Sequence, residues 1–163
     1  MTDDLHARHP PVPMTLQQRI ESAMRDAMRA HDQRRTLTLR MAMAAIQNRR
    51  IELRRDLSDE DVVDVLTKQA KQRRESLEIF RDAGRESMAQ NEEAELAVIE
   101  EFLPEPLPAH ELERIVRDAI AETGASSPAD MGRVMGRVAP ATKGRADGRA
   151  VSELVRRLLA EAG

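Results

Sequence analysis

The stretch Leu103-Pro104-Glu105-Pro106-Leu107-Pro108 divides this sequence into two helical parts. Three prolines so close together cannot continue an α-helix, because proline lacks the backbone N–H that a helix needs. Apolar residues recur at helical spacing on both sides, and no segment alternates as a strand does. The sequence therefore predicts an all-α protein: a four-helix N-terminal unit at 14–103, a Pro-rich hinge at 104–108 and a three-helix C-terminal domain at 109–163.

Four amphipathic segments precede the prolines. Thr15 is a suitable N-cap for the first, and Ser58, followed by three acids, suits the start of the third. Gly84 is a typical residue just beyond a helix C-terminus. Residues 1–13 hold three prolines and no periodic pattern, which predicts a disordered leader. The first segment's expected apolar stripe is Leu16, Ile20, Met24 and Met28.

Three further segments follow the prolines. The first ends at Gly124, and Ser127-Pro128 is a typical helix start for the second, which we expect Pro140 to end. A loop at 141–148 then leads to the last helix. Its expected apolar face is Val151, Leu154, Val155, Leu158 and Leu159.

Composition excludes several classes of protein. The 163 residues contain no cysteine, which excludes disulfides, thiolate metal sites and a thiol nucleophile. Phe80 and Phe102 are the only aromatic residues, so platforms for base stacking are nearly absent. No run approaches the roughly 18 apolar residues of a membrane span. We therefore expect a soluble, cytoplasmic protein without a membrane partner.

Charge is divided unevenly along the chain, although the formal net charge is only −3. The stretch 19–55 contains ten arginines and four acids, and 131–157 contains seven basic residues and two acids. Between them, 86–123 contains eleven acids and two arginines. The near-neutral total is therefore compatible with local basic surfaces that bind an anionic partner.

No catalytic or metal-binding pattern stands out, and we predict no catalytic residue, no metal and no cofactor. None of the four histidines belongs to a Glu-x-x-His or His-Glu-x-x-His motif. The acids between Glu92 and Glu101 favour a solvated helix face over metal ligands. For the run 71–75, a solvated face or a Lys71–Glu75 pair is favoured over an anion site.

Two glycine-containing motifs carry the strongest functional signal. In the loop 143–148, two glycines and the basic residues Lys143, Arg145 and Arg149 surround a helix start, which suits a phosphate. Turn geometry with solvated basic side chains explains the same residues equally well. Gly132 and Gly136 lie on one helix face, where close helix packing is favoured over access for an RNA backbone.

The order of these motifs resembles the GatB/YqeY family, specifically its free-standing YqeY-like members. The resemblance extends from about Thr15 to Leu159. It rests on the motifs Leu39-Arg40-Met41, Leu57-Ser58-Asp59-Glu60, Lys71-Gln72-Arg73-Arg74-Glu75-Ser76, Phe102-Leu103-Pro104, Glu122-Thr123-Gly124-Ala125, Met131-Gly132-Arg133-Val134-Met135-Gly136 and Lys143-Gly144-Arg145-Ala146-Asp147-Gly148.

This resemblance implies a helical part joined to a three-helix domain similar to the tail of the glutamine-dependent aspartyl/glutamyl-tRNA amidotransferase B subunit. It implies a non-catalytic, bacterial tRNA-binding module, associated with carbon–nitrogen ligase activity only at the level of the family. The alternative is an accessory subunit that binds amidotransferase subunits or another complex through its acidic stretch. No DNA partner is expected. The predicted RNA-binding residues are Arg133, Arg137, Lys143, Gly144, Arg145, Gly148 and Arg149.

Overall fold

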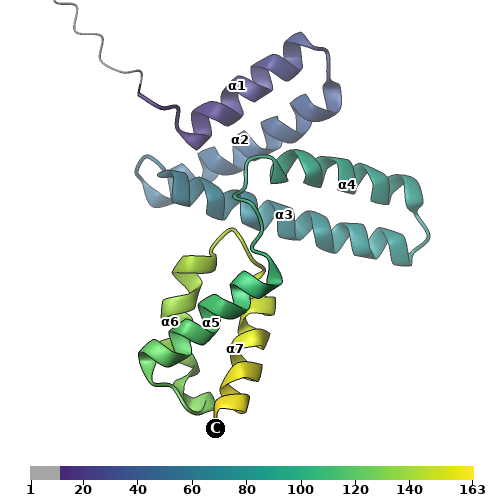
Figure 1. Cartoon of the computed structure of the whole chain (residues 1–163). Helices are drawn as coiled ribbons and strands as arrows, with labels where there is room; N and C mark the ends of the chain where they lie inside the picture. Colours follow the sequence, from purple (N-terminus) through teal and green to yellow (C-terminus); the bar gives the residue numbers. More distant parts are fainter. Residues whose placement is uncertain (1–11) are drawn as a thin grey trace, which may run out of the picture. The chain divides into compact units, whose positions relative to one another are not determined.

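The computed structural model describes residues 12–163, and all regular structure in this range is helical (Figure 1). The all-α prediction is therefore confirmed for the described part of the chain. The chain divides into two compact units between Val62 and Val63, within a helix, rather than at the prolines. Of the predicted leader at 1–13, only residues 12–13 are described.

The first unit contains a hairpin of α1 (Leu16–Arg29) and α2 (Gln33–Leu53). Thr15 caps α1 as predicted: its hydroxyl accepts from the Gln18 amide, and the Gln18 side chain accepts from the Thr15 amide. Helix α1 buries Leu16, Ile20 and Ala27. The predicted stripe was wrong at Met28, which is exposed because the buried face turns to Ala27.

Helix α3 (Asp59–Asp82) begins in the first unit and continues into the second. Its start is a reciprocal cap, in which the Ser58 hydroxyl accepts from the Asp61 amide and the Asp61 carboxylate accepts from the Ser58 amide. The Arg55 guanidinium binds the same carboxylate at 2.6 Å. Arg55 first, and then the Ser58 amide, hold the pKa of Asp61 well below its usual range.

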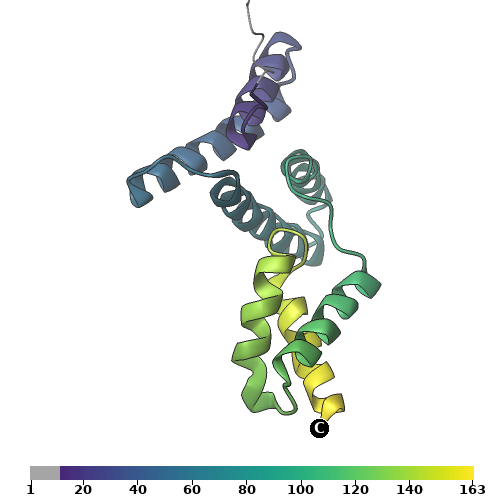
Figure 2. The ribbon, with the colours of Figure 1, turned by 60° about the vertical axis from the view of Figure 1, so that its left-hand side comes forward.

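In the second unit, α3 and α4 (Glu86–Glu100) run side by side as a second hairpin (Figures 1 and 2). Gly84 adopts the left-handed conformation with φ 69°, and the Arg85 amide donates to the Phe80 carbonyl at 2.8 Å. This is the predicted glycine stop after α3. The apolar residues Val65, Leu66, Ala70, Leu77, Ala89, Leu96 and Ile99 are buried.

The rest of the second unit contains α5 (Ala109–Thr123), the short 3-10 helix η1 (Pro128–Asp130), α6 (Met131–Thr142) and α7 (Gly148–Ala162). Helices α5, α6 and α7 pack pairwise as a three-helix bundle (Figure 1). Their buried core is Val116, Ala119, Ala125, Val134, Val138, Val151, Val155, Leu158 and Leu159.

Pro140 does not end α6, which continues to Thr142. A proline at this position removes the hydrogen bond to the carbonyl four residues earlier. That carbonyl belongs to Gly136, an exposed residue, so water can bind it in place of the missing N–H. The last turn is also held by the Thr142 hydroxyl, which donates to the Val138 carbonyl at 3.0 Å.

Candidate nucleic-acid interface

The loop between α6 and α7 is fixed against α3 within the second unit. Its first basic residue, Lys143, forms an ion pair with Asp64 of α3 at 3.0 Å. Both side chains are about half exposed, so the pair contributes roughly 0–1 kcal/mol to stability. The ion pair has a clearer effect on the position of Lys143, because it holds the ammonium group beside α3.

Gly144 is the point of closest approach between this loop and α3. Its φ is +72°, in the left-handed region that side chains disfavour. A Cβ atom at this position would lie 2.5 Å from Cγ1 of Val63, well inside van der Waals contact. Backbone conformation and packing therefore both require glycine here.

Arg145 joins the loop to the Pro-rich segment. Its Nε donates to the Glu105 carbonyl at 3.1 Å, and its own carbonyl accepts from the Leu107 amide at 2.7 Å. The segment predicted as a hinge is thus attached to the loop by two hydrogen bonds. The guanidinium group of Arg145 already serves an internal contact.

The start of α7 remains open. Asp147 occupies the N-cap position, but its side chain makes no capping hydrogen bond. Gly148 and Arg149 are both exposed, and a Cβ atom at Gly148 would meet nothing within 4 Å. This part of the predicted site is accessible and makes no contact of the kind that holds Lys143 and Arg145 to other segments.

The two glycines of α6 do not admit a neighbouring helix. A Cβ atom at Gly132 or Gly136 would meet nothing within 4 Å, and both residues are exposed. The prediction of close helix packing was therefore wrong. The buried face of α6 consists of Val134, Val138 and Thr142, so both glycines lie on the outer side of this helix.

Beside these glycines is a shallow hollow of about 440 Å³, lined by Thr123, Arg133, Gly136 and Arg137, which we call the α6 hollow. Arg133 donates to the Thr123 carbonyl at 3.2 Å and to Asp130 at 2.6 Å. Arg137 pairs with Glu122 at 3.2 Å. Both guanidinium groups are thus held at the end of α5 while more than half of each side chain stays exposed.

Asp130 belongs to the same network. Its carboxylate accepts from the Ser126 amide at 3.0 Å and the Ser127 amide at 3.3 Å. The Ser126 amide first, and then Arg133, lower the pKa of Asp130. The carboxylate is therefore ionised at neutral pH and orients Arg133.

The predicted RNA-binding residues do not form one cluster. Arg133 lies near the start of α6, whereas Arg149 follows the loop at the other end of that helix. No sequence pattern assigned a role to Thr123, which lines the α6 hollow, or to Asp130 and Glu122, which pair with its two arginines. The Asp130–Arg133 spacing of three residues could have indicated their pairing. The contact with Thr123 depends on how α5 and α6 pack, and no local pattern indicates it.

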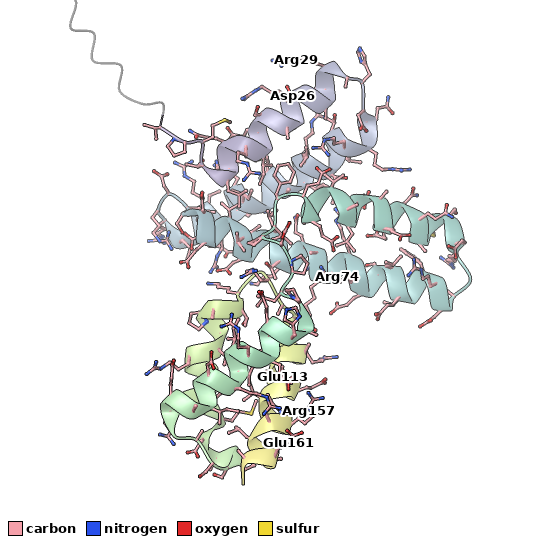
Figure 3. The ribbon with its side chains drawn as sticks, in the orientation of Figure 1. Asp26, Arg29, Arg74, Glu113, Arg157 and Glu161 are labelled. Carbon is pink, nitrogen blue, oxygen red and sulfur yellow. The ribbon has the colours of Figure 1, made fainter. Side chains whose placement is uncertain are left out.

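A second missed cluster lies in the α3–α4 hairpin. Arg73 on α3 is buried and pairs with Glu92 and Glu95 on α4, both of which are mostly buried. The solvated face predicted for these residues was therefore wrong. Arg74, labelled in Figure 3, pairs with Glu100 at 3.0 Å. Several acids of the stretch predicted to meet a basic partner are thus engaged within their own hairpin.

Another group of charges lies on α5 and α7, where Figure 3 shows Glu113, Arg157 and Glu161 close together. Arg117 pairs with Glu113 at 2.8 Å and lies 3.8 Å from Glu161. These arginines lie among acids, so this side of the bundle offers a weaker anion site than the α6 hollow.

Within residues 12–163, no group of three or more histidine, aspartate or glutamate side chains is arranged to hold a metal ion. No helix in the described chain combines the length and apolar character needed to cross a bilayer.

A family model described as "Yqey-like protein" matches residues 17–159. The chain belongs to the YqeY-like family. The resemblance drawn from the ordered motifs is thus confirmed over nearly the whole chain. The YqeY-like match includes both the α6 hollow and the 143–148 loop.

Two curated proteins are similar to this YqeY-like chain. "Altered inheritance of mitochondria protein 41, mitochondrial" of Pyrenophora tritici-repentis is 31% identical over 132 residues, which cover 78% of this chain and 71% of that protein. An uncharacterized protein of Schizosaccharomyces pombe is 31% identical over 90 residues, covering 55% of this chain and 73% of that protein. The first name places that relative in the mitochondrion; for the present chain, the cytoplasmic location stays a prediction.

Proposed function

We propose that this YqeY-like protein is a non-catalytic module that binds structured RNA, with tRNA as the first candidate, through the α6 hollow. The observation that carries the proposal is the pairing of two exposed arginines with two open glycines on one helix. Arg133 and Arg137 are one turn apart, and Gly132 and Gly136 leave the adjacent backbone uncovered. A sugar–phosphate backbone can therefore approach α6 closely between two guanidinium groups.

The chemistry favours recognition of shape and phosphate rather than bases. The chain has two phenylalanines and no tyrosine or tryptophan, so stacking on unpaired bases is almost unavailable. Arginine binds phosphate with two parallel N–H donors, which suits the regular backbone of a folded RNA.

The internal ion pairs set the strength of this binding. Arg133 and Arg137 already pair with Asp130 and Glu122, so a phosphate must compete with two carboxylates. Release of counterions from the RNA supplies much of the driving force, and the affinity therefore falls as salt rises. We expect modest affinity and, for two phosphate contacts, a log–log salt slope of roughly −1.4 to −1.8.

The predicted residues in and next to the 143–148 loop differ in their roles. Lys143, Gly144 and Arg145 hold the loop through contacts with Asp64, Val63 and Glu105. RNA contacts at these three residues stay a prediction. Gly148 and Arg149 are exposed at the start of α7, separate from the α6 hollow, and RNA contacts there also stay a prediction.

The test is binding of the full chain to a tRNA pool across a salt series. The double variant Arg133→Glu/Arg137→Glu should bind at least tenfold more weakly, because two phosphate contacts become repulsive. Each lost contact should also flatten the log–log salt slope by roughly 0.7–0.9. Arg114→Glu/Arg117→Glu on α5 is the matched control, with the same charge change at exposed, ion-paired arginines.

Retained affinity in the control together with loss in the α6 variant would support the proposal. Absence of wild-type binding at low salt would refute it. Equal losses in both variants would refute it as well, because they would show that net charge rather than the α6 hollow determines binding.

A further inference from the structure

Helix α2 has a second apolar face that its hairpin with α1 leaves exposed. The face toward α1 buries Leu39, Ala42 and Ile46. On the opposite side, alternating steps of four and three residues place five exposed side chains in one line, which we call the α2 seam: Leu37, Met41, Ala44, Asn48 and Ile51. This spacing repeats every seven residues and is typical of a helix that packs along another helix.

The large members of the α2 seam are strongly exposed. Leu37 is 55% exposed, Met41 47% and Ile51 65%, whereas large apolar side chains are usually covered. Met28, at the end of α1, adds a further exposed methionine near Leu37. Methionine side chains adapt their shape to different partners, which suits a docking surface. Figure 2 shows α1 along one side of α2, as the buried face requires.

Each end of the α2 seam adjoins a shallow hollow that also includes an arginine. One hollow of about 310 Å³ is lined in part by Met28, Leu37 and Arg40. The other, of about 380 Å³, has Ile51 as its one apolar lining residue; the rest of its lining is polar or charged: Gln47, Arg50, Arg54, Arg55 and Asp56. Leu37 and Ile51 lie about 21 Å apart along the axis at ~1.5 Å per residue, the length of about four helical turns.

The charges beside the α2 seam are mainly positive. Arg40 and Arg54 are exposed along one side. Glu52, on the other side, is paired with Arg49 at 2.9 Å, which offsets its charge. A second copy of the chain would bring an equally basic helix to the α2 seam. In addition, stable interfaces bury roughly 1,200–2,000 Å², more than one line of five side chains provides. An acidic helix is complementary in charge and suits this size.

We infer that the α2 seam docks an amphipathic helix of a partner protein, with apolar residues at heptad spacing flanked by glutamates or aspartates over about four turns. Apolar side chains of that helix pack on Leu37, Met41 and Ile51. Its acids face Arg40 and Arg54, which line the two hollows. This interaction is independent of RNA binding at the α6 hollow.

The test uses the full chain and a synthetic peptide of about four heptads, with leucine at positions a and d and glutamate at e and g. The peptide is longer than the four-turn α2 seam because short isolated helices are only marginally stable in water. Repulsion between the glutamates limits self-association of this peptide at neutral pH. A second peptide with lysine in place of every glutamate is its control. Fluorescence anisotropy should show binding of the acidic peptide and at least tenfold weaker binding of the basic one.

Ile51→Glu should weaken binding of the acidic peptide at least tenfold, because it places a carboxylate in the α2 seam. Ile79→Glu is a matched control, since Ile79 is 66% exposed on α3 in the second unit. Circular dichroism checks that both variants fold. Equal binding of the two peptides, or equal losses in the two variants, would overturn the inference, as would absence of binding.

Two further outcomes would assign the α2 seam to another occupant and so overturn the inference. The first is a wild-type dimer in sedimentation velocity that Ile51→Glu dissociates, which would identify a second copy of the chain. The other is displacement of the acidic peptide by a tRNA pool from wild-type protein and from Arg133→Glu/Arg137→Glu alike, which would place RNA on α2.

Discussion

The 143–148 loop and the outer face of α6 have similar composition but different surroundings. Each combines two glycines with basic residues in a short stretch of the second unit. In the loop, Gly144 lies against Val63 and Arg145 binds the Glu105 carbonyl. On α6, Gly132 and Gly136 meet nothing within 4 Å, and Arg133 and Arg137 stay mostly exposed.

This difference shows that glycine beside arginine in a sequence does not by itself predict whether the segment is packed or exposed. A glycine is required where the backbone adopts a positive φ or where another chain segment approaches, and Gly144 meets both conditions. A glycine within an exposed helix costs stability, so its presence at Gly132 and Gly136 has no packing explanation. The open glycines are therefore the better indication of a binding surface.

The largest expected effect is on the free energy of unfolding of Gly144→Ala. Its Cβ would lie 2.5 Å from Val63 in a left-handed backbone conformation, so we expect destabilisation. Strain and overpacking together suggest about 2–4 kcal/mol. Gly136→Ala should have the opposite sign and stabilise the protein by roughly 0.5–1 kcal/mol, because alanine favours a helix and finds open space.

Urea unfolding followed by far-ultraviolet circular dichroism measures both changes. Destabilisation of similar size in the two variants would contradict the proposed contrast between a packed loop and an open helix face. Binding of the tRNA pool to Gly136→Ala adds a second measurement. The added methyl group should weaken binding if an RNA backbone approaches α6 at this glycine.

A smaller effect is expected for Arg145→Ala, which removes the hydrogen bond to the Glu105 carbonyl. The hydrogen bond from the Leu107 amide to the Arg145 carbonyl uses only backbone atoms and can persist. We therefore expect a loss of about 1 kcal/mol in unfolding free energy. Limited proteolysis should cut 104–108 faster in this variant than in the wild type.

Arg137→Ala is the matched variant on α6. Its ion pair with Glu122 is exposed on both sides, so the unfolding free energy should change by less than about 0.5 kcal/mol. If Arg137→Ala destabilises the chain more than Arg145→Ala, then Arg137 has a structural role and the assignment of these two arginines must be reversed.

Local signals predicted most of the helices. Thr15 and Ser58 form the expected caps, and Gly84 ends α3 as a left-handed residue. Four of the five residues expected on the apolar face of α7 are buried, and Leu154 is partly buried. These features depend on side chains within a few residues of one another, so the sequence contains the information directly. The prediction that Pro140 ends α6 was wrong, because the carbonyl that it leaves without a hydrogen bond is exposed and can bind water.

The candidate site was less predictable, since its geometry depends on contacts between distant segments. Lys143 meets Asp64, and Arg73 meets Glu92 and Glu95, through packing that no spacing rule indicates. The sequence identified Arg133 and Arg137 as candidates but favoured packing for the glycines beside them. Whether these glycines pack against another helix depends on which side of α6 faces the core, and neither glycine lies on the buried side.

The smallest expected effect is on how the unfolding free energy changes with pH, and it concerns Asp130 beside the α6 hollow. The pKa of Asp130 is lowered by the Ser126 amide and by Arg133, so the folded state binds its proton less readily than the unfolded state. Stability from this group is therefore present above about pH 4, the ordinary aspartate range, and is lost as pH falls through the lowered pKa. Asp130→Asn should lower the unfolding free energy at pH 7. Between pH 7 and pH 3, the unfolding free energy of this variant should fall by less than that of the wild type. Urea unfolding at both pH values measures this, and parallel curves for variant and wild type would show that Asp130 does not stabilise the start of α6.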